Sequence, residues 1–312
     1  MYLSVSVIIP AYNAANSIRE LIKSISNQTY SSEKTEIIVI DDCSTDKTLD
    51  ILAELKHQYD VQIISHDQNK GLAAARNTGI KNSSGRIFIF IDADMIVGSH
   101  YIENHINFHN NKQVVGVVGN IVRHESLKYD KYQKYLYKTK RGVKKYSPKE
   151  SLPFHAFIFG NTSIKKEVID NCGLFDEEIK AYGGEDTEFS FRIAQKYPQG
   201  LFYSLAIKSI HNHYRDLDSA LINVSRFGET NIPYIIKKHP EMSKLYALKY
   251  ISIKYDNSSI FHRIIGKFIM TNLFYITMKF IYKTLPFPIC TLPLKALMAS
   301  VLLRGAKRGL NQ

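Results

Sequence analysis

Two pairs of aspartates stand out in this sequence because each pair follows directly on an apolar run. Asp92 and Asp94 come after residues 87–91, and Asp41 and Asp42 close an earlier run of isoleucine and valine. Two carboxylates this close together repel each other unless a cation lies between them or one of them binds a proton. Hard divalent cations take oxygen ligands of this kind, often together with phosphate groups. The sequence therefore predicts a site for a cation and a phosphorylated ligand.

The elements that must position these acids alternate between strand and helix. Such alternation predicts a mainly parallel sheet that is covered by helices on both faces. The carboxyl ends of parallel strands meet at one edge of the sheet, where open α/β sheets bind their ligands. The predicted strands are residues 4–10, 36–40, 61–65 and 86–91, and the predicted helices begin near residues 18, 46 and 72. Both aspartate pairs are thus expected at the same edge.

Local patterns place the first two of these helices. Ser17 and Glu20 have the spacing of a capping box at the start of the first helix. The second helix is expected to turn four apolar residues toward the core: Leu49, Ile51, Leu52 and Leu55.

The length of the chain limits its domain organisation, and its cysteine content indicates the redox compartment. With 312 residues, 45% of them hydrophobic, the chain can bury a full core as one large domain or two smaller ones. Its three cysteines, Cys43, Cys172 and Cys290, are far apart and match no metal-binding spacing, which favours a reducing compartment. Residues 4–10 are typical of a strand and no basic segment precedes them, so a signal peptide is not expected. We therefore expect a cytoplasmic protein.

Missing motifs narrow the class of ligand. No Gly-x-Gly-x-x-Gly follows the first strand, and no P-loop motif occurs anywhere in the chain. Dinucleotide oxidoreductases and P-loop enzymes are therefore disfavoured. At the end of the first strand, Pro10, Tyr12 and Asn13 offer instead an aromatic face and an amide that suit a nucleobase.

Five sequence blocks resemble one known family in their order and spacing: residues 5–13, 40–46, 69–77, 91–94 and 182–189. With these blocks the chain is similar to the family 2 glycosyltransferases, and the resemblance fades after about residue 215. It implies an α/β fold of the GT-A type, in which helices flank a mainly parallel nucleotide-binding sheet. Beyond it we expect a C-terminal amphipathic helical extension.

The resemblance implies an enzyme that moves a sugar from a nucleotide diphosphate sugar, with UDP as the expected nucleotide, to a hydroxyl group with inversion. It assigns Asp42 to the uracil base, Asp92 to the ribose or to the water shell of a metal, and Arg76 to the neighbourhood of the nucleotide, where Pro10 and Tyr12 also lie. A plain turn-forming role for Asp42 and a surface ion pair for Arg76 are the alternatives.

A divalent cation, Mg²⁺ or Mn²⁺, is implied as cofactor. Asp94 matches the principal metal ligand of the family, and Asp92 matches the first acid of the pair. His211 and His213 follow a predicted strand at i,i+2 spacing, which would point both imidazoles the same way. The resemblance implies that a histidine in this part of the chain completes the metal shell, and His213 is expected in preference to His211. A structural role for these histidines is the alternative.

The catalytic base implied by the resemblance is Asp186, which would take the proton of the attacking hydroxyl. Glu185 is kept as a partner that accepts from a sugar hydroxyl or supports the base, and Gly183 and Gly184 would let the backbone approach the sugar. On the acceptor side the resemblance adds Asn161. Acids at the start of a helix also stabilise that helix through its dipole, which is the structural alternative for Glu185 and Asp186.

The excess positive charge of the chain lies at its C-terminal end. The formal net charge is +12, and residues 237–312 hold 13 Lys and Arg against two acids, Glu241 and Asp256. A second basic stretch, residues 123–149, interleaves lysine with tyrosine and is interpreted as an acceptor-side loop or a contact with lipid headgroups.

Residues 267–283 have the pattern of one amphipathic basic helix. Lysines interrupt every window of about 20 residues, so an ordinary transmembrane helix is not expected. A basic amphipathic helix lies in a membrane interface. A second apolar helix, residues 294–303, ends in Arg304, Lys307 and Arg308, a cluster that anionic lipid attracts. Packing of these helices on the catalytic part or on another subunit is the alternative.

Three segments follow from these patterns: residues 1–98 bind the nucleotide sugar, 99–225 bind the acceptor and carry out catalysis, and 226–312 associate with the membrane. The expected partners are a nucleotide-sugar donor, a glycan or lipid-linked acceptor and an anionic membrane surface, with the protein peripheral on the inner face of the cell membrane. A sugar nucleotidyltransferase and a non-enzymatic membrane-binding or nucleic-acid-binding module are the alternatives. Nucleic acid is not expected as a partner, because such a module leaves the aspartates without a role.

Overall fold

The computed structural model describes residues 3–148, 150–252, 254–255 and 258–311, which form two compact units. The N-terminal unit comprises Met1–Leu127, Lys140–Lys180 and Glu185–His213. The C-terminal unit comprises Lys128–Thr139, Ala181–Gly184 and Tyr214–Gln312. Lys149 and Asp256, which contributed to the sequence predictions, lie outside the described residues.

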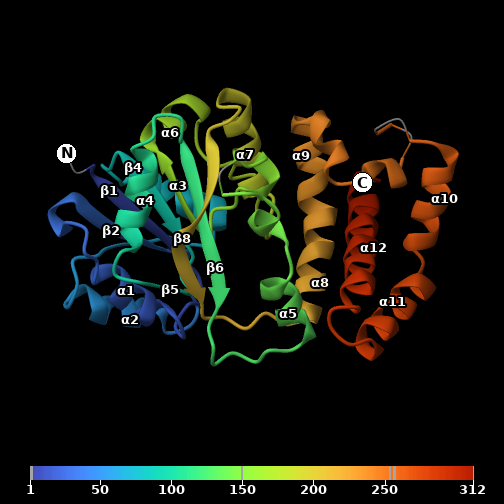
Figure 1. The fold of residues 1–312 in the computed structure, drawn as a ribbon, viewed down its shortest axis with the longest axis horizontal. Coiled ribbons are helices and arrows are strands. Elements are labelled where there is room, and N and C mark those ends of the chain that lie inside the picture. The colour runs from blue at the N-terminus through green and yellow to red at the C-terminus, as the bar shows by residue number, and fades with distance from the viewer. Residues whose placement is uncertain (1–2, 149, 253, 256–257, 312) are drawn as a thin grey trace. The chain divides into compact units, whose positions relative to one another are not determined.

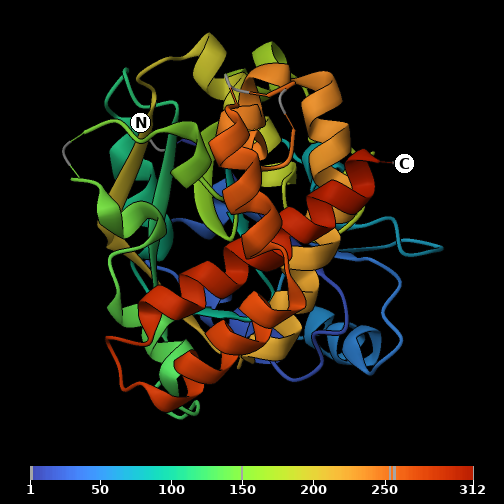
Figure 2. The ribbon, with the colours of Figure 1, turned by 90° about the vertical axis from the view of Figure 1, so that its right-hand side faces the viewer.

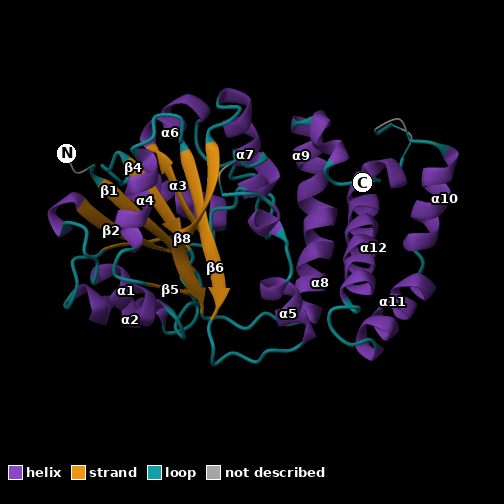
Figure 3. Ribbon diagram, viewed as in Figure 1, coloured by secondary structure: helices purple, strands orange, loops and turns teal. Residues whose placement is uncertain are grey.

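The N-terminal unit is built on one eight-stranded sheet with the strand order β3-β2-β1-β4-β7-β6-β8-β5 (Figures 1 and 3). The first four strands in this order run parallel, whereas β7 is antiparallel to both β4 and β6, and β5 is antiparallel to β8. The strands are β1 (Val5–Ala11), β2 (Thr35–Asp41), β3 (Gln62–Ser65), β4 (Ile87–Ile91), β5 (Met95–Val97), β6 (Gly116–Arg123), β7 (Asn161–Lys165) and β8 (Leu201–His211).

Helices cover both faces of this sheet. Every residue of β1 and β4 is buried, as expected of central strands with helices on either side. The apolar residues of α1, α2 and α4 form the core on one face, and those of α3, α6 and α7 form the core on the other. The helices of this unit are α1 (Ile18–Ser26), α2 (Thr48–Lys56), α3 (Leu72–Lys81), α4 (Tyr101–His109), α6 (Lys166–Cys172) and α7 (Glu185–Lys196).

The predicted order of strands and helices in the first hundred residues is confirmed, but two local predictions are wrong. Ser17 makes no side-chain capping bond, and Glu20 accepts a hydrogen bond from the Asn212 side chain (2.6 Å) instead of closing a capping box. Leu49 points to solvent, because α2 begins only at Thr48 and turns Leu52 and Leu55 toward the core.

The C-terminal unit is helical. Its helices are α5 (Lys131–Lys138), α8 (Leu217–Arg226), α9 (Ile232–Lys238), α10 (Ile260–Ile269), α11 (Asn272–Thr284) and α12 (Thr291–Leu310), with a π-helical turn, η4 (Phe227–Asn231), between α8 and α9. Glycines let α12 lie against η4 at backbone distance: a Cβ built on Gly228 would come 2.6 Å from the carbonyl oxygen of Leu302.

Two predictions about this unit are corrected. Residues 267–283 form parts of two helices, because the chain breaks between α10 and α11 with a bend of 62°. Part of the predicted loop 123–149 is helix α5, in which Asp130 is the N-cap and Tyr132 and Tyr135 are buried. The alternation of lysine and tyrosine there reflects the two sides of a packed helix.

Within the described residues, no single helix is long and apolar enough to cross a membrane. Among these described helices, α10 and α11 together, across their bend, have the length and composition of a span. The three predicted segments do not match the two compact units one to one, since residues 1–98 and most of 99–213 share the N-terminal unit. The separate roles given to those segments stay predictions.

Candidate active site

The guanidinium group of Arg76 lies among three carboxylates at the carboxyl edge of the sheet. Arg76 is on α3 and is only 1% exposed. Its Nη1 lies 2.5 Å from Asp186 Oδ1 and 3.2 Å from Glu185 Oε1. Its Nη2 lies 3.8 Å from Asp92 Oδ1. Arg76 thus joins the acids at the start of α7 to the first acid after β4.

Aromatic rings and one backbone group complete this cluster. The Arg76 guanidinium lies 5.3 Å from the centroid of the Phe175 ring and 5.8 Å from that of Phe159, close enough for cation–π attraction. The backbone N–H of Phe159 donates to Asp186 Oδ2 (3.1 Å). Both oxygens of the Asp186 carboxylate are therefore held from inside the protein, while the side chain keeps an exposed fraction of 19%.

Burial sets the electrostatics of the cluster. Burial alone would lower the pKa of the Arg76 guanidinium, but the surrounding carboxylates outweigh this effect and raise that pKa above its ordinary value. Burial and the charge of Asp186 together raise the pKa of Glu185 to about 7. Glu185 and Asp186 do begin α7, so the helix-dipole interpretation also holds for them. Their contacts with Arg76 show that the dipole is not their whole role.

The turn between β4 and β5 brings Asp92 close to the backbone of Gly160. A Cβ built on Gly160 would come 2.7 Å from Asp92 Oδ2, so a larger residue would displace this carboxylate. The two backbones are also joined by a hydrogen bond from Asp92 N–H to the Gly160 carbonyl oxygen (3.2 Å). Glycine at position 160 therefore fixes where the Asp92 side chain can lie.

Asp94 lies next to His211, the last residue of β8. His211 Nε2 is 3.1 Å from Asp94 Oδ2, and the backbone N–H of Asn212 donates to the Asp94 carbonyl oxygen (2.7 Å). β8 ends at His211, so the i,i+2 alternation that was expected to point both imidazoles the same way does not extend to His213. His213 is exposed, with its ring centroid 6.1 Å from that of His211. His211 thus contacts Asp94, and metal binding by His213 stays a prediction.

The carboxylates of Asp92 and Asp94 fit a hard divalent cation whose other coordination positions are filled by a bound ligand and water. Among the described residues, no group of three or more His, Cys, Asp or Glu side chains is arranged as a complete metal site. Mg²⁺ is commonly held by one or two carboxylates, with substrate phosphates and water supplying the other oxygens. Asp92 and Asp94, on one short turn, match that smaller requirement.

The carboxylate of Asp42 holds a loop in place. Its Oδ1 accepts from the backbone N–H of Lys70 and its Oδ2 from that of Gly71, both at 2.8 Å. His66 Nδ1 lies 2.7 Å from Asp42 Oδ1, and His66 Nε2 lies 2.9 Å from Thr78 Oγ1. Sequence analysis missed His66, although a histidine directly after the third strand was a signal for the same sheet edge.

The end of β1 is partly as predicted. Pro10 is buried within the strand, and Tyr12 is 51% exposed, so its ring is accessible for stacking. Asn13 is also exposed, and its Oδ1 accepts from the backbone N–H of Thr45 (2.8 Å). The parallel register of β1 with β2 and β4 puts Tyr12, Asp42 and Asp92 at one edge of the sheet.

Each of the three residues assigned to the acceptor side has a structural role within the protein. Asn161 is fully buried, accepts from Tyr101 Oη (2.9 Å) and donates to Ser209 Oγ (2.9 Å). Gly183 and Gly184 have φ angles of 93° and 100°, which only glycine adopts without strain. The close approach that Gly184 permits is to the Phe227 ring, since a Cβ there would lie 2.7 Å from it. Contact of these residues with an acceptor stays a prediction.

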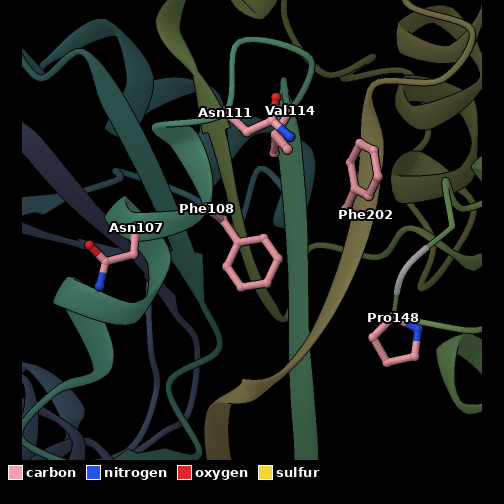
Figure 4. A pocket seen from close by; sticks show the side chains of 6 residues that line it. All are labelled: Asn107, Phe108, Asn111, Val114, Pro148 and Phe202. Atoms are coloured by element: carbon pink, nitrogen blue, oxygen red, sulfur yellow. The ribbon is translucent and has the colours of Figure 1, made fainter.

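A separate open pocket of about 390 Å³ lies at the other end of the strands (Figure 4). It is lined by Asn107, Phe108, Asn111, Val114, Pro148 and Phe202. The carbonyl oxygen of Val115, next to the lining residue Val114, accepts a hydrogen bond from the backbone N–H of Lys165. Lys165 pairs with Ile87, the first residue of β4, so the pocket lies near the start of that strand. The carboxylate cluster follows the last residue of β4, so this pocket is not part of the candidate site.

Comparison with known proteins decides the family. The family model described as glycosyl transferase family 2 matches residues 6–173, which is more than half of the chain. The chain belongs to glycosyltransferase family 2. The family 2 match includes β1, β2, β4 and their aspartates, whereas Asp186 lies beyond it. The protein is thus a glycosyltransferase, and the two alternative classes considered from the sequence are set aside.

Two curated relatives are longer than this chain, which matches only part of each. It is 30% identical over 258 residues to the minor teichoic acid biosynthesis protein GgaB of Bacillus subtilis, covering 77% of this chain and 27% of GgaB. It is 31% identical over 100 residues to the poly(ribitol-phosphate) beta-N-acetylglucosaminyltransferase TarS of Staphylococcus aureus, covering 32% of this chain and 18% of TarS.

Solved structures of two glycosyltransferases share the fold. TarS 1–349 in complex with UDP matches with a TM-score of 0.57 and 15% identity, over 98% of this chain and 90% of that one. The mannosyltransferase PcManGT of Pyrobaculum calidifontis, in complex with GDP-Man and Mn²⁺, matches with a TM-score of 0.62 and 18% identity, over 99% and 88%. At these identities the likeness shows the fold alone. The predicted α/β fold of the GT-A type is confirmed.

Proposed function

We propose that this glycosyltransferase moves a sugar from a UDP-sugar to a hydroxyl group with inversion, in a single displacement. The observation that carries this proposal is the bridge through Arg76, which links Asp186, the proposed base, to Asp92 on the proposed donor side. Two groups that act on opposite sides of one anomeric carbon must be held at a fixed separation, and a shared buried cation does this.

Asp186 acts as the general base. Its carboxylate oxygens each accept one hydrogen bond, from Arg76 Nη1 and from the Phe159 backbone, and keep further lone pairs for a hydroxyl proton. As the acceptor oxygen forms its bond to the anomeric carbon, its proton passes to Asp186 and the bond from that carbon to the diphosphate breaks. Glu185, whose pKa is raised to about 7 by burial and by the charge of Asp186, supports the same Arg76 from inside.

The donor lies along the edge formed by β1, β2 and β4. Tyr12 offers its exposed ring to the base. The carboxylate of Asp42, which is buried and held by His66 and the backbone N–H groups of Lys70 and Gly71, is the group assigned to the base N–H. The UDP bound by TarS supports uridine diphosphate as the nucleotide. The GDP-Man bound by PcManGT shows that another base is used on the same fold.

Asp92 and Asp94 would hold a divalent cation, Mg²⁺ or Mn²⁺, with His211 beside Asp94. When bound, such a cation supplies Lewis-acid stabilisation of the departing diphosphate. The Mn²⁺ in the PcManGT complex supports a metal requirement.

The acceptor is a lipid-linked or cell-surface glycan precursor, and the enzyme works as a peripheral protein on the inner face of the cell membrane. The support for this acceptor class is the likeness to GgaB, which is named for minor teichoic acid biosynthesis, and to TarS, which is named for poly(ribitol-phosphate). The basic C-terminal unit supports the location.

A donor panel tests the proposal. UDP-sugars and GDP-sugars are added with and without Mn²⁺, and the thermal unfolding of the protein is followed. A ligand at 100 times its Kd stabilises the folded state by about 2.7 kcal/mol. We expect a UDP-sugar to stabilise the protein only when the metal is present. This stabilisation should be lost in Asp94→Ala and kept in Asp60→Ala, which changes an exposed aspartate outside the site. Stabilisation by GDP-sugars alone would contradict the choice of nucleotide.

A further inference from the structure

Two consecutive helices of the C-terminal unit expose a continuous set of large apolar side chains, which we call the apolar ridge. Its residues are 59–72% exposed, although soluble proteins rarely leave such side chains grouped in the open. On α10 they are Ile260, Phe261, Ile264 and Phe268. On α11 they are Leu273, Ile276 and Phe280. Their spacing puts each set on one side of its helix.

The opposite side of α11 is the one that packs inside the unit. Tyr275 and Met278 pack against the cluster of Leu297 and Val301 on α12, and Tyr282 is buried in a neighbouring cluster. Figure 2 shows α10, α11 and α12 as neighbouring orange-to-red helices. The inner side of α11 therefore makes the packing contacts expected of an amphipathic helix. The apolar ridge takes no part in those contacts and stays exposed.

The bend between the two helices is held by α12. Ser300 Oγ donates to the carbonyl oxygen of Ile269 (2.7 Å). Arg304 Nη1 donates to Asn272 Oδ1 (3.0 Å), and its Nη2 donates to the carbonyl oxygen of Thr271. Arg304, expected from the sequence to meet lipid, thus serves this bend. Because these three hydrogen bonds hold the break between α10 and α11, the two helices form a bent pair and not a straight span with an interruption.

The dimensions favour shallow insertion. At 1.5 Å per residue, α10 is about 15 Å long and α11 about 20 Å long. The hydrocarbon core of a bilayer is about 30 Å thick, so neither helix crosses it alone. With the 62° bend held in place, the two helices lie along a surface more readily than they pass through it.

Charge points to an anionic surface. No Asp or Glu occurs between residues 260 and 284. Lys267 and Lys283 are exposed on the same sides of α10 and α11 as the ridge. Lysines beside an apolar face can keep their ammonium groups among lipid headgroups while the apolar side chains enter the acyl boundary.

We propose that the apolar ridge inserts into one leaflet of an anionic lipid bilayer and holds the enzyme on the membrane surface without crossing it. This inference deepens the membrane location proposed above. It does not depend on the sugar-transfer reaction, because its test uses neither donor nor acceptor.

The first test is flotation with lipid vesicles. We expect the full chain to bind vesicles of phosphatidylcholine with phosphatidylglycerol. Its affinity for vesicles of pure phosphatidylcholine should be at least about tenfold lower. The variant Ile276→Gln/Phe280→Gln should lose at least about tenfold in affinity for the mixed vesicles. The matched control Leu49→Gln/Leu205→Gln, which changes two exposed apolar residues of the N-terminal unit, should bind like the parent.

The second test measures depth. The chain contains no tryptophan, so Phe280→Trp and Leu205→Trp each introduce a single probe. We expect brominated lipids to quench the tryptophan at position 280, most strongly when the bromines are near the headgroups, and to leave the one at position 205 unquenched. Vesicle binding without quenching at 280, or quenching strongest at the bilayer centre, would overturn shallow insertion.

A second copy of the chain is the competing occupant of the ridge. Sedimentation without lipid that shows a dimer, together with loss of that dimer in Ile276→Gln/Phe280→Gln and no vesicle binding by the parent, would overturn the proposal. Asp186→Asn should bind vesicles like the parent, so failure of the membrane inference and failure of the catalytic proposal are separable.

Discussion

Asp186 Oδ1 and Arg76 Nη1 meet at 2.5 Å, although 110 residues separate them in the chain. Arg76 was expected near the nucleotide and Asp186 near the acceptor, and the structure joins them in one ionic cluster. A change at Arg76 should therefore affect both folding and catalysis.

Arg76→Gln should lower the free energy of unfolding by about 3–5 kcal/mol, because it leaves the buried Glu185 and the partly exposed Asp186 without their cation. Urea denaturation measures this effect. The matched control is Arg19→Gln, which breaks an exposed ion pair with Glu54 and should cost less than about 1 kcal/mol. Equal small losses in the two variants would show that Arg76 does not hold the cluster together.

Asp186→Asn should keep donor binding and lose transfer. The amide can still accept a hydrogen bond but cannot take the proton of the acceptor hydroxyl, so turnover should fall by about 10²–10⁴-fold. Donor affinity by calorimetry and initial rates with saturating donor measure the two effects separately. Wild-type turnover in this variant would remove Asp186 from the mechanism.

His66→Ala should weaken donor binding. His66 lies 2.7 Å from Asp42 Oδ1 and orients the carboxylate assigned to the base, so its loss should cost about 1.5–3 kcal/mol of donor affinity. Turnover at saturating donor should change little, since His66 contacts none of the carboxylates around Arg76. The control is His57→Ala, an exposed histidine, and a purely structural role would show as reduced turnover and reduced affinity together.

Two buried histidines should make the fold sensitive to acid. His105 Nδ1 and His109 Nε2 share Ser163 Oγ at 2.9 and 2.8 Å, and burial lowers the pKa of each from 6.5 to about 3. Between pH 6.5 and 3 the unfolded chain binds the extra protons, so the free energy of unfolding should fall as the pH falls through this window. The slope is up to about 1.4 kcal/mol per pH unit for each histidine.

Denaturation at several pH values measures this slope. The variant His105→Asn/His109→Asn should show a shallower dependence than the parent between pH 6.5 and 3. An unchanged slope would mean that other groups, such as paired carboxylates, account for the acid sensitivity.

Sequence patterns predicted the parts of the fold that depend on local periodicity. Continuous apolar runs predicted β1, β2 and β4, and the strand alternation placed their aspartates at one edge, as the parallel register shows. What the patterns did not predict is the burial of Arg76. Two of its partners lie on a helix that begins at residue 185 and the third follows β4, and no local signal in residues 72–81 indicates them.

The corrected helix prediction also has a physical reason. The helix predicted over residues 267–283 breaks because Thr271 caps α11 through a bond to Phe274 N–H and because α12 holds the bend. Contacts from Ser300 and Arg304, far along the chain, cannot be seen in the periodicity of residues 267–283.

The stereochemistry of the product tests the central claim most directly. With an α-linked UDP-sugar as donor and a synthetic hydroxyl acceptor, proton NMR of the newly formed linkage reports the configuration at the anomeric carbon. A single displacement with Asp186 as base predicts a β-linked product, formed about 10²–10⁴-fold more slowly by Asp186→Asn. An α-linked product from the wild-type enzyme would contradict the account.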